Sequence, residues 1–132
     1  MRRFTGIATA GLLLALLPSA KAEAHARLVA ASPRESGLLA ASPAKLDLWF
    51  DEVLDEGFHE VTVVPVDEAP AKARNRAGVV AVDPDDRTHL SVPLERLPNG
   101  AWAVRWRVLS RDGRGARGRF EFRVIRDRDG AY

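Results

Sequence analysis

The sequence predicts an all-β domain, an antiparallel β-sandwich or small barrel of about seven short strands. Apolar and polar residues alternate in several segments, which places every second side chain on one face of a strand. Turn-forming residues such as Pro98-Asn99-Gly100 interrupt these segments. The sequence contains no long stretch with the periodicity of an amphipathic helix, so strands are favoured throughout the domain.

Three strands are expected in the first half of the domain, at residues 27–31, 45–50 and 60–66. Ser32-Pro33 ends the first strand. The second alternates cleanly and directs three apolar side chains to one face: Leu46, Leu48 and Phe50. The third is rich in β-branched residues, and its Pro65 indicates an edge strand or a strand end because proline cannot donate to the ladder.

Four strands are expected in the second half, at residues 79–82, 88–92, 102–109 and 119–125. An Asp-Pro-Asp-Asp turn separates the first two. The last two alternate best and carry Trp102, Trp106, Phe120 and Phe122 on their apolar faces. We therefore predict one shared core that contains Phe50, Val104, Trp106, Phe120 and Phe122.

The chain is organised as a leader, one domain and a short tail. Residues 1–24 read as a secretory signal peptide, with two arginines, an apolar stretch at residues 7–17 and a final Ala22-Glu23-Ala24. Residues 25–126 form the expected domain, and residues 127–132 form a polar tail. The apolar stretch is too short to span a bilayer, and we expect no transmembrane segment in the mature chain.

Cleavage after Ala24 would make His25 the first residue of the mature protein. An N-terminal histidine carries an α-amine and an imidazole, which can together chelate a metal, and such nitrogen donors suit copper. Cleavage after Ala20 or Ala22 fits the small-residue pattern equally well and would leave His25 as an ordinary loop residue.

Composition excludes several classes of site. The chain has no cysteine, so zinc-finger, thiolate-copper and cysteine-nucleophile chemistry are excluded. Its one methionine, Met1, belongs to the predicted leader, which excludes a methionine-rich Cu(I) site in the mature domain.

The mature domain is close to neutral, and we predict no nucleic-acid partner. Its charges are nevertheless uneven, with acidic residues concentrated at 51–60 and arginines at 105–128. Alternate arginines on strands usually form a solvated face, and we favour that interpretation over a phosphate-binding patch.

Four blocks of sequence resemble the CopC-type periplasmic copper-binding proteins, in that family's order. They read H-A-R-L with A-S-P at 25–33, L-D-L-W-F-D-E at 46–52, W-A-V-R-W-R-V-L-S-R-D-G at 102–113 and G-R-F-E-F-R-V at 118–124. The resemblance implies a Greek-key, immunoglobulin-like β-sandwich or barrel and export to the periplasm or beyond. It also favours cleavage directly before His25.

The resemblance also implies a Cu(II) site. Carried over residue by residue, its metal-binding positions are His25, through amine and ring, and Asp112, with Glu52 as a nearby or axial partner. Where the family's D-G-H motif has histidine, this chain has Arg114. A guanidinium stays protonated and cannot ligate a cation, so the site is expected to be weakened. His59 and His89 are each interpreted as partly exposed strand residues, with a substitute-ligand role as the minority alternative.

Two functions of different class follow. The first is an exported Cu(II) carrier or buffer in copper homeostasis or resistance, without catalysis, whose partners would be copper ion and a membrane copper importer. The second is a degenerate CopC-like domain that binds no metal and acts as a structural or protein-interaction module. We expect no enzyme activity, because no Ser/His/Asp arrangement, phosphate loop or H-E-x-x-H motif is present.

Overall fold

A computed structural model of the chain describes residues 6, 11 and 26–126. The predicted signal peptide, apart from residues 6 and 11, lies outside the described residues, as do His25 and the predicted tail at 127–132. No helix that is both long and apolar enough to cross a membrane occurs in the described part of the chain.

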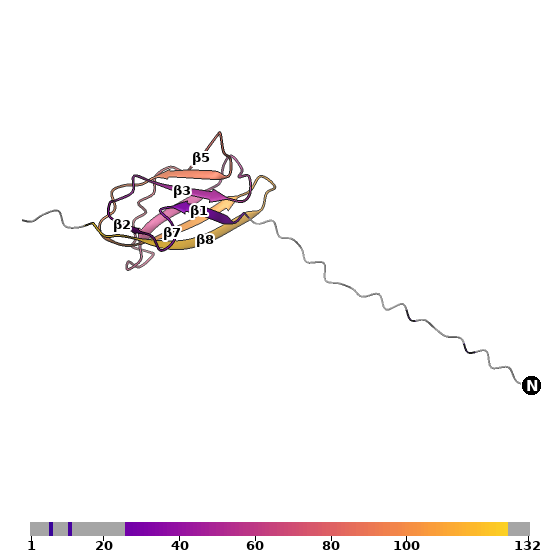
Figure 1. Cartoon of the computed structure of the whole chain (residues 1–132), viewed down its shortest axis with the longest axis horizontal. Coiled ribbons are helices and arrows are strands. Elements are labelled where there is room, and N and C mark those ends of the chain that lie inside the picture. The colour runs from indigo at the N-terminus through magenta and orange to yellow at the C-terminus, as the bar shows by residue number, and fades with distance from the viewer. Residues whose placement is uncertain (1–5, 7–10, 12–25, 127–132) are drawn as a thin grey trace, which may run out of the picture.

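In the described part of the chain, eight strands form two four-stranded sheets that lie as separate layers (Figure 1). One sheet has the order β1-β3-β6-β5 and the other the order β2-β8-β7-β4. The strands are β1 (Leu28–Ser32), β2 (Leu38–Leu39), β3 (Lys45–Phe50), β4 (Glu60–Pro65), β5 (Ala81–Val82), β6 (His89–Pro93), β7 (Gly100–Leu109) and β8 (Gly115–Val124). All pairings are antiparallel except that of β2 with β8. The predicted all-β sandwich is confirmed.

The core lies between the two sheets and consists of the inward side chains of the alternating strands, joined by Ala26, Leu54 and Leu97 from outside the strands. Leu46, Leu48 and Phe50 of β3 are buried, as the alternation predicts. The buried side chains of β7 and β8 include Trp102, Val104, Trp106, Val108, Phe120, Phe122 and Val124. The predicted shared core is therefore confirmed.

The strand ends differ from the sequence-based expectation in a few places. β7 begins two residues earlier than expected, and β8 begins at Gly115 rather than at residue 119, because these two strands pair over their whole length. β5 has only two residues. β2 was not expected, because it pairs over only two residues, with Arg123 and Val124 of β8.

Pro65 ends β4, which is the edge strand of its sheet. Pro65 therefore marks both an edge strand and a strand end, the two alternatives that its position in the sequence indicates. The connection that follows β4 is tied back to it by Asn75, whose Oδ1 accepts hydrogen bonds from the backbone N–H groups of Val63 at 2.8 Å and Ala77 at 3.0 Å. The bond from Val63 satisfies one backbone donor on the edge of β4, which pairs with no further strand in the described residues.

Candidate functional site

The loop between β7 and β8 carries Asp112 and is ordered by a buried serine. Ser110 is 1% exposed, and its hydroxyl hydrogen-bonds Oδ1 of Asp112. The backbone N–H of Gly113 donates to the carbonyl oxygen of Ser110 at 2.9 Å. Gly113 has a φ of 87°, a conformation that glycine adopts without steric cost, so the tight turn depends on this residue.

The environment of Asp112 favours its ionised form. The Ser110 hydroxyl, followed by the backbone N–H of Arg114 at 3.1 Å, lowers the pKa of Asp112 below its ordinary value. Both of these donors contact Oδ1, while Oδ2 lies 3.8 Å from Nε of Arg114. The two side chains are about half exposed, so this ion pair is loose and screened by solvent. Oδ2 is consequently the oxygen that a cation could approach, beside a fixed positive charge.

A second segment, between β3 and β4, runs along this loop. The N–H of Arg111 donates to the carbonyl oxygen of Val53, and the N–H of Asp55 donates to that of Leu109, both at 2.9 Å. Glu52, the predicted partner residue, directly precedes Val53 and is half-buried. Among the described residues, its carboxylate forms no ion pair.

The described start of the domain lies against the same segment. The N–H of Arg27 donates to Oδ1 of Asp51 at 2.7 Å, and the N–H of Asp51 donates to the carbonyl oxygen of Arg27 at 3.0 Å. Ala26 is buried in the core. Three chain segments, those of Arg27, Glu52 and Asp112, therefore meet at one end of the sandwich.

The structure brings two of the three predicted metal-binding residues onto neighbouring segments, Glu52 and Asp112. His25 lies outside the described residues. Within residues 26–126 no group of three or more His, Cys, Asp or Glu side chains could hold a metal ion. A copper site at this end would therefore need nitrogen donors from the residues that precede Ala26.

His59 has a structural role close to this end of the domain. Its Nδ1 accepts a hydrogen bond from the N–H of Leu109 at 3.2 Å, so its Nε2 carries the proton and donates to the carbonyl oxygen of Asp55 at 2.7 Å. Both ring nitrogens are thus occupied by backbone partners. This arrangement ties the segment before β4 to the end of β7 and leaves no lone pair for a metal.

His89 belongs to a separate polar cluster on the outer face of the other sheet. Its Nε2 lies 2.7 Å from Oδ1 of the buried Asp47, and its Nδ1 lies 3.1 Å from Oδ2 of Asp83. Burial opposes the charged imidazolium, but hydrogen bonds to the two carboxylates outweigh it and raise the pKa of His89. The ring also stacks on Trp49, with centroids 4.6 Å apart, which gives that outward-facing tryptophan a packing role.

Three residues that hold these segments and side chains in place were not predicted from the sequence. Asp51 holds the start of the domain, Ser110 fixes Asp112, and Asp47 pairs with His89. The recognisable local signal is Asp112-Gly113, since an aspartate side chain bonds the backbone two residues on, as Asp112 does with the N–H of Arg114. The partners of Asp51 and Asp47 are distant in sequence, so no local sequence pattern predicts these two contacts.

Comparison with known proteins identifies the family. The CopC domain family matches residues 28–125 of this chain. The chain belongs to the CopC family. It is 34% identical to copper resistance protein C of Pseudomonas syringae pv. tomato over 92% of this chain and 94% of that protein.

A second relative and a solved structure agree with this assignment. The copper transport protein CutJ of Bacillus subtilis is 29% identical over 86% of this chain, but the match spans only 20% of CutJ. The crystal structure of CopC from Methylosinus trichosporium OB3b superposes with a TM-score of 0.70 at 26% identity, covering 82% of this chain and all of that one. The CopC-type resemblance is confirmed, and membership of this family gives the protein a copper-related function.

Proposed function

We propose that this CopC-family protein is an exported Cu(II) carrier or buffer with a weakened metal site. The metal-binding groups would be the amine and imidazole of His25 and Oδ2 of Asp112, with Glu52 nearby. One observation carries the proposal: Asp112, hydrogen-bonded by Ser110, lies on a loop that adjoins, through Val53, the segment to which Arg27 is bonded. Because Arg27 follows His25 by two residues, this end of the sandwich is where the first residue of the mature chain would begin.

The donor set suits Cu(II) rather than Cu(I). A tetragonal Cu(II) centre takes nitrogen and oxygen donors in one plane, and two nitrogens, one carboxylate oxygen and a water would supply them. The guanidinium of Arg114, 3.8 Å from Oδ2 of Asp112, would oppose an incoming divalent cation. The site is therefore proposed to be weaker than one in which a second imidazole replaces this charge.

Substitution of Arg114 by histidine tests the proposal. We expect Arg114→His to bind Cu(II) at least tenfold more tightly than the unaltered mature protein, because a positive charge is removed and an imidazole is added. The measurement is calorimetric titration with Cu(II), with an N-terminal His25 verified by mass spectrometry. Arg96→His is the matched control, because Arg96 is exposed and lies in the connection between β6 and β7.

A second variant isolates the chelating amine. One glycine added before His25 removes the α-amine from the chelate and keeps the imidazole, so it should abolish most of the Cu(II) binding. Equal affinity with and without this glycine would contradict the proposed donor set. An Arg114→His protein that folds correctly but binds no more tightly than the unaltered one would contradict the assignment of Asp112 and Arg114 to the site.

The ion pair between Arg114 and Asp112 supports a second candidate, a CopC-family domain that binds no metal and serves as an interaction module. Absence of detectable Cu(II) binding by the unaltered mature protein would favour this candidate. The match to one fifth of CutJ instead favours a role beside copper transport machinery, and a membrane copper importer is the partner we propose.

A further inference from the structure

The outer face of the β4-β7-β8 layer carries an arginine face, defined by Arg105 and Arg107 of β7 and by Arg117 and Arg119 of β8. All four side chains are exposed. Arg105 lies directly opposite Arg119 and Arg107 directly opposite Arg117 in the antiparallel register. Like-charged residues directly opposite one another destabilise a sheet, and the one acid that faces these arginines across a ladder is Glu60 of β4, which lies opposite Arg107 in the described residues.

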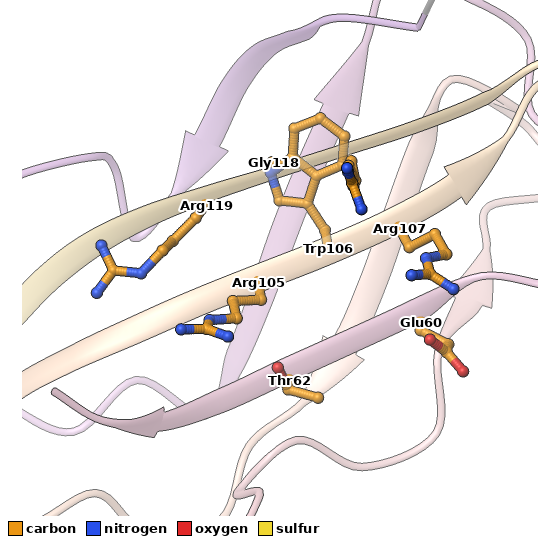
Figure 2. A pocket seen from close by; sticks show the side chains of 8 residues that line it. Glu60, Thr62, Arg105, Trp106, Arg107, Gly118 and Arg119 are labelled. Atoms are coloured by element: carbon orange, nitrogen blue, oxygen red, sulfur yellow. The ribbon is translucent and has the colours of Figure 1, made fainter. Parts of the chain in front are cut away.

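Neighbouring acids neutralise little of this charge. Arg119 pairs with Glu121 on its own strand at 2.6 Å. Arg105, Arg107 and Arg117 form no ion pair within the part of the chain that the structure describes. Glu60 and Thr62 of β4 border the face, and Figure 2 shows the side chains of Arg105 and Arg119 extending in the same direction.

These side chains line an open groove of about 480 Å³ that also reaches Trp106 and Gly118 (Figure 2). Every cation in it is a guanidinium, whose planar fork binds carboxylates through two parallel hydrogen bonds. Alternate residues on a strand repeat about every 6.6–6.8 Å, and facing residues of neighbouring strands lie about 4.5–5.5 Å apart. An extended acidic segment with a carboxylate at every second residue has the same repeat.

We infer that this arginine face is a docking site for an extended acidic segment of a partner protein. A membrane fits less well, because stable attachment needs an apolar or lipid anchor besides basic charge. None of the exposed large apolar side chains in the described residues belongs to β7 or β8. The inference does not rest on copper binding, although Arg107 and Arg117 lie within three residues of the ends of the Asp112 loop.

Binding of a defined peptide tests the inference. The probe is a ten-residue peptide of alternating glutamate and threonine with blocked ends, and the same peptide with glutamine in place of glutamate is its control. We expect the acidic peptide to bind at low salt and the glutamine peptide not to bind. The double variant Arg105→Gln/Arg117→Gln should bind about tenfold more weakly, while Arg96→Gln should bind as the unaltered protein does.

Other outcomes would overturn the inference. Unchanged peptide binding in the double variant would place the acidic segment elsewhere. Binding to vesicles of phosphatidylserine and phosphatidylcholine without peptide binding would identify a membrane-facing surface, and displacement of the peptide by an equal concentration of inorganic phosphate would identify a small-anion site. The melting temperature gives an independent measurement: the double variant should be as stable as the unaltered protein or more so, and a lower value would show that these arginines serve the fold.

Discussion

A single buried hydroxyl group determines how Asp112 is presented at the end of the sandwich. The Ser110 hydroxyl lies within hydrogen-bonding distance of Oδ1 of Asp112 and 3.1 Å from the carbonyl oxygen of Arg114. It therefore ties the two sides of the loop together and lowers the pKa of the carboxylate. Ser110 has this effect although it is not itself a candidate ligand.

We expect Ser110→Ala to raise the pKa of Asp112 toward its ordinary value, because the largest cause of its lowering is removed. A lowered pKa contributes stability above the unfolded-state value that is lost as pH falls through the folded-state value, so the variant should lose less stability on acidification. An NMR titration of the Asp112 side-chain carbon measures this directly. An unchanged midpoint in a folded variant would contradict the role assigned to Ser110.

His89 should make the protein less stable as pH rises, whereas the lowered pKa of Asp112 makes it less stable as pH falls. Its raised pKa means that the contribution of its charged form is fully present below about pH 6.5 and is lost as pH rises through the folded-state value. The charged groups around it are Asp47 and Asp83, with Lys45 lying 3.6 Å from Asp47.

Replacement of this histidine tests the linkage. Urea unfolding at pH 5.5 and pH 8.5 should show a loss of stability at the higher pH in the unaltered protein and a smaller loss in His89→Gln. Equal pH dependence in the two proteins would contradict the assignment. His59→Gln would be a poor control, because both nitrogens of His59 bond the backbone.

At the scale of strands, local alternation predicted the long elements, made β5 two residues too long and missed β2. β3 has the predicted bounds because its inward leucines and Phe50 alternate without interruption. β2 was missed because its pairing with Arg123 and Val124 brings together residues that are more than eighty positions apart. Such a pairing is defined by tertiary contact, and two residues carry no periodicity.

Gly118 of β8 leaves no room for a side chain, because the indole ring of Trp106 on β7 occupies that space. It lies opposite Trp106, and a Cβ built at this glycine would meet Cζ2 of the indole at 2.2 Å. The ring therefore lies directly over the backbone of β8. We expect Gly118→Ala to lower the free energy of unfolding by about 1–3 kcal/mol through overpacking, measured by urea denaturation.

Gly57→Ala is the matched control for this prediction. A Cβ at Gly57 meets nothing within 4 Å, so the substitution should change stability little. Equal effects of the two substitutions would show that the contact with Trp106 is not what requires a glycine at position 118.

At the scale of the whole molecule, Trp106 joins the two sheets. Its ring meets Phe50 of the opposite sheet edge-on, with centroids 5.1 Å apart and an interplanar angle of 75°. Trp106→Ala should cost about 3–5 kcal/mol of unfolding free energy, because a large cavity would open between the layers. Leu38→Ala is the control, since Leu38 is 70% exposed and should contribute little. A loss below about 1 kcal/mol would contradict the core assignment.

The sequence allowed the class of fold and the core to be predicted, because both depend on local pattern, while the residues assigned to the metal site rest on motif resemblance and stay a prediction. It did not allow the anchoring of Arg27 by Asp51 or the pairing of His89 with Asp47 to be predicted. These contacts depend on which strands become neighbours. The alternating arginines were interpreted as a solvated face, and only the register shows that they oppose one another in like-charged pairs.

The short β2 strand has a consequence for how copies of the protein meet one another. Within the described residues it pairs with Arg123 and Val124 of β8, and the N–H of Ser36 before it donates to the carbonyl oxygen of Glu121, which leaves residues 115–120 of that edge without a paired strand. Uncovered edges invite pairing between copies and aggregation. Arg117 and Arg119 lie along this edge, and two copies pairing there would bring their guanidinium groups together. The charge proposed to attract an acidic partner would thus also help to keep the protein monomeric at high concentration.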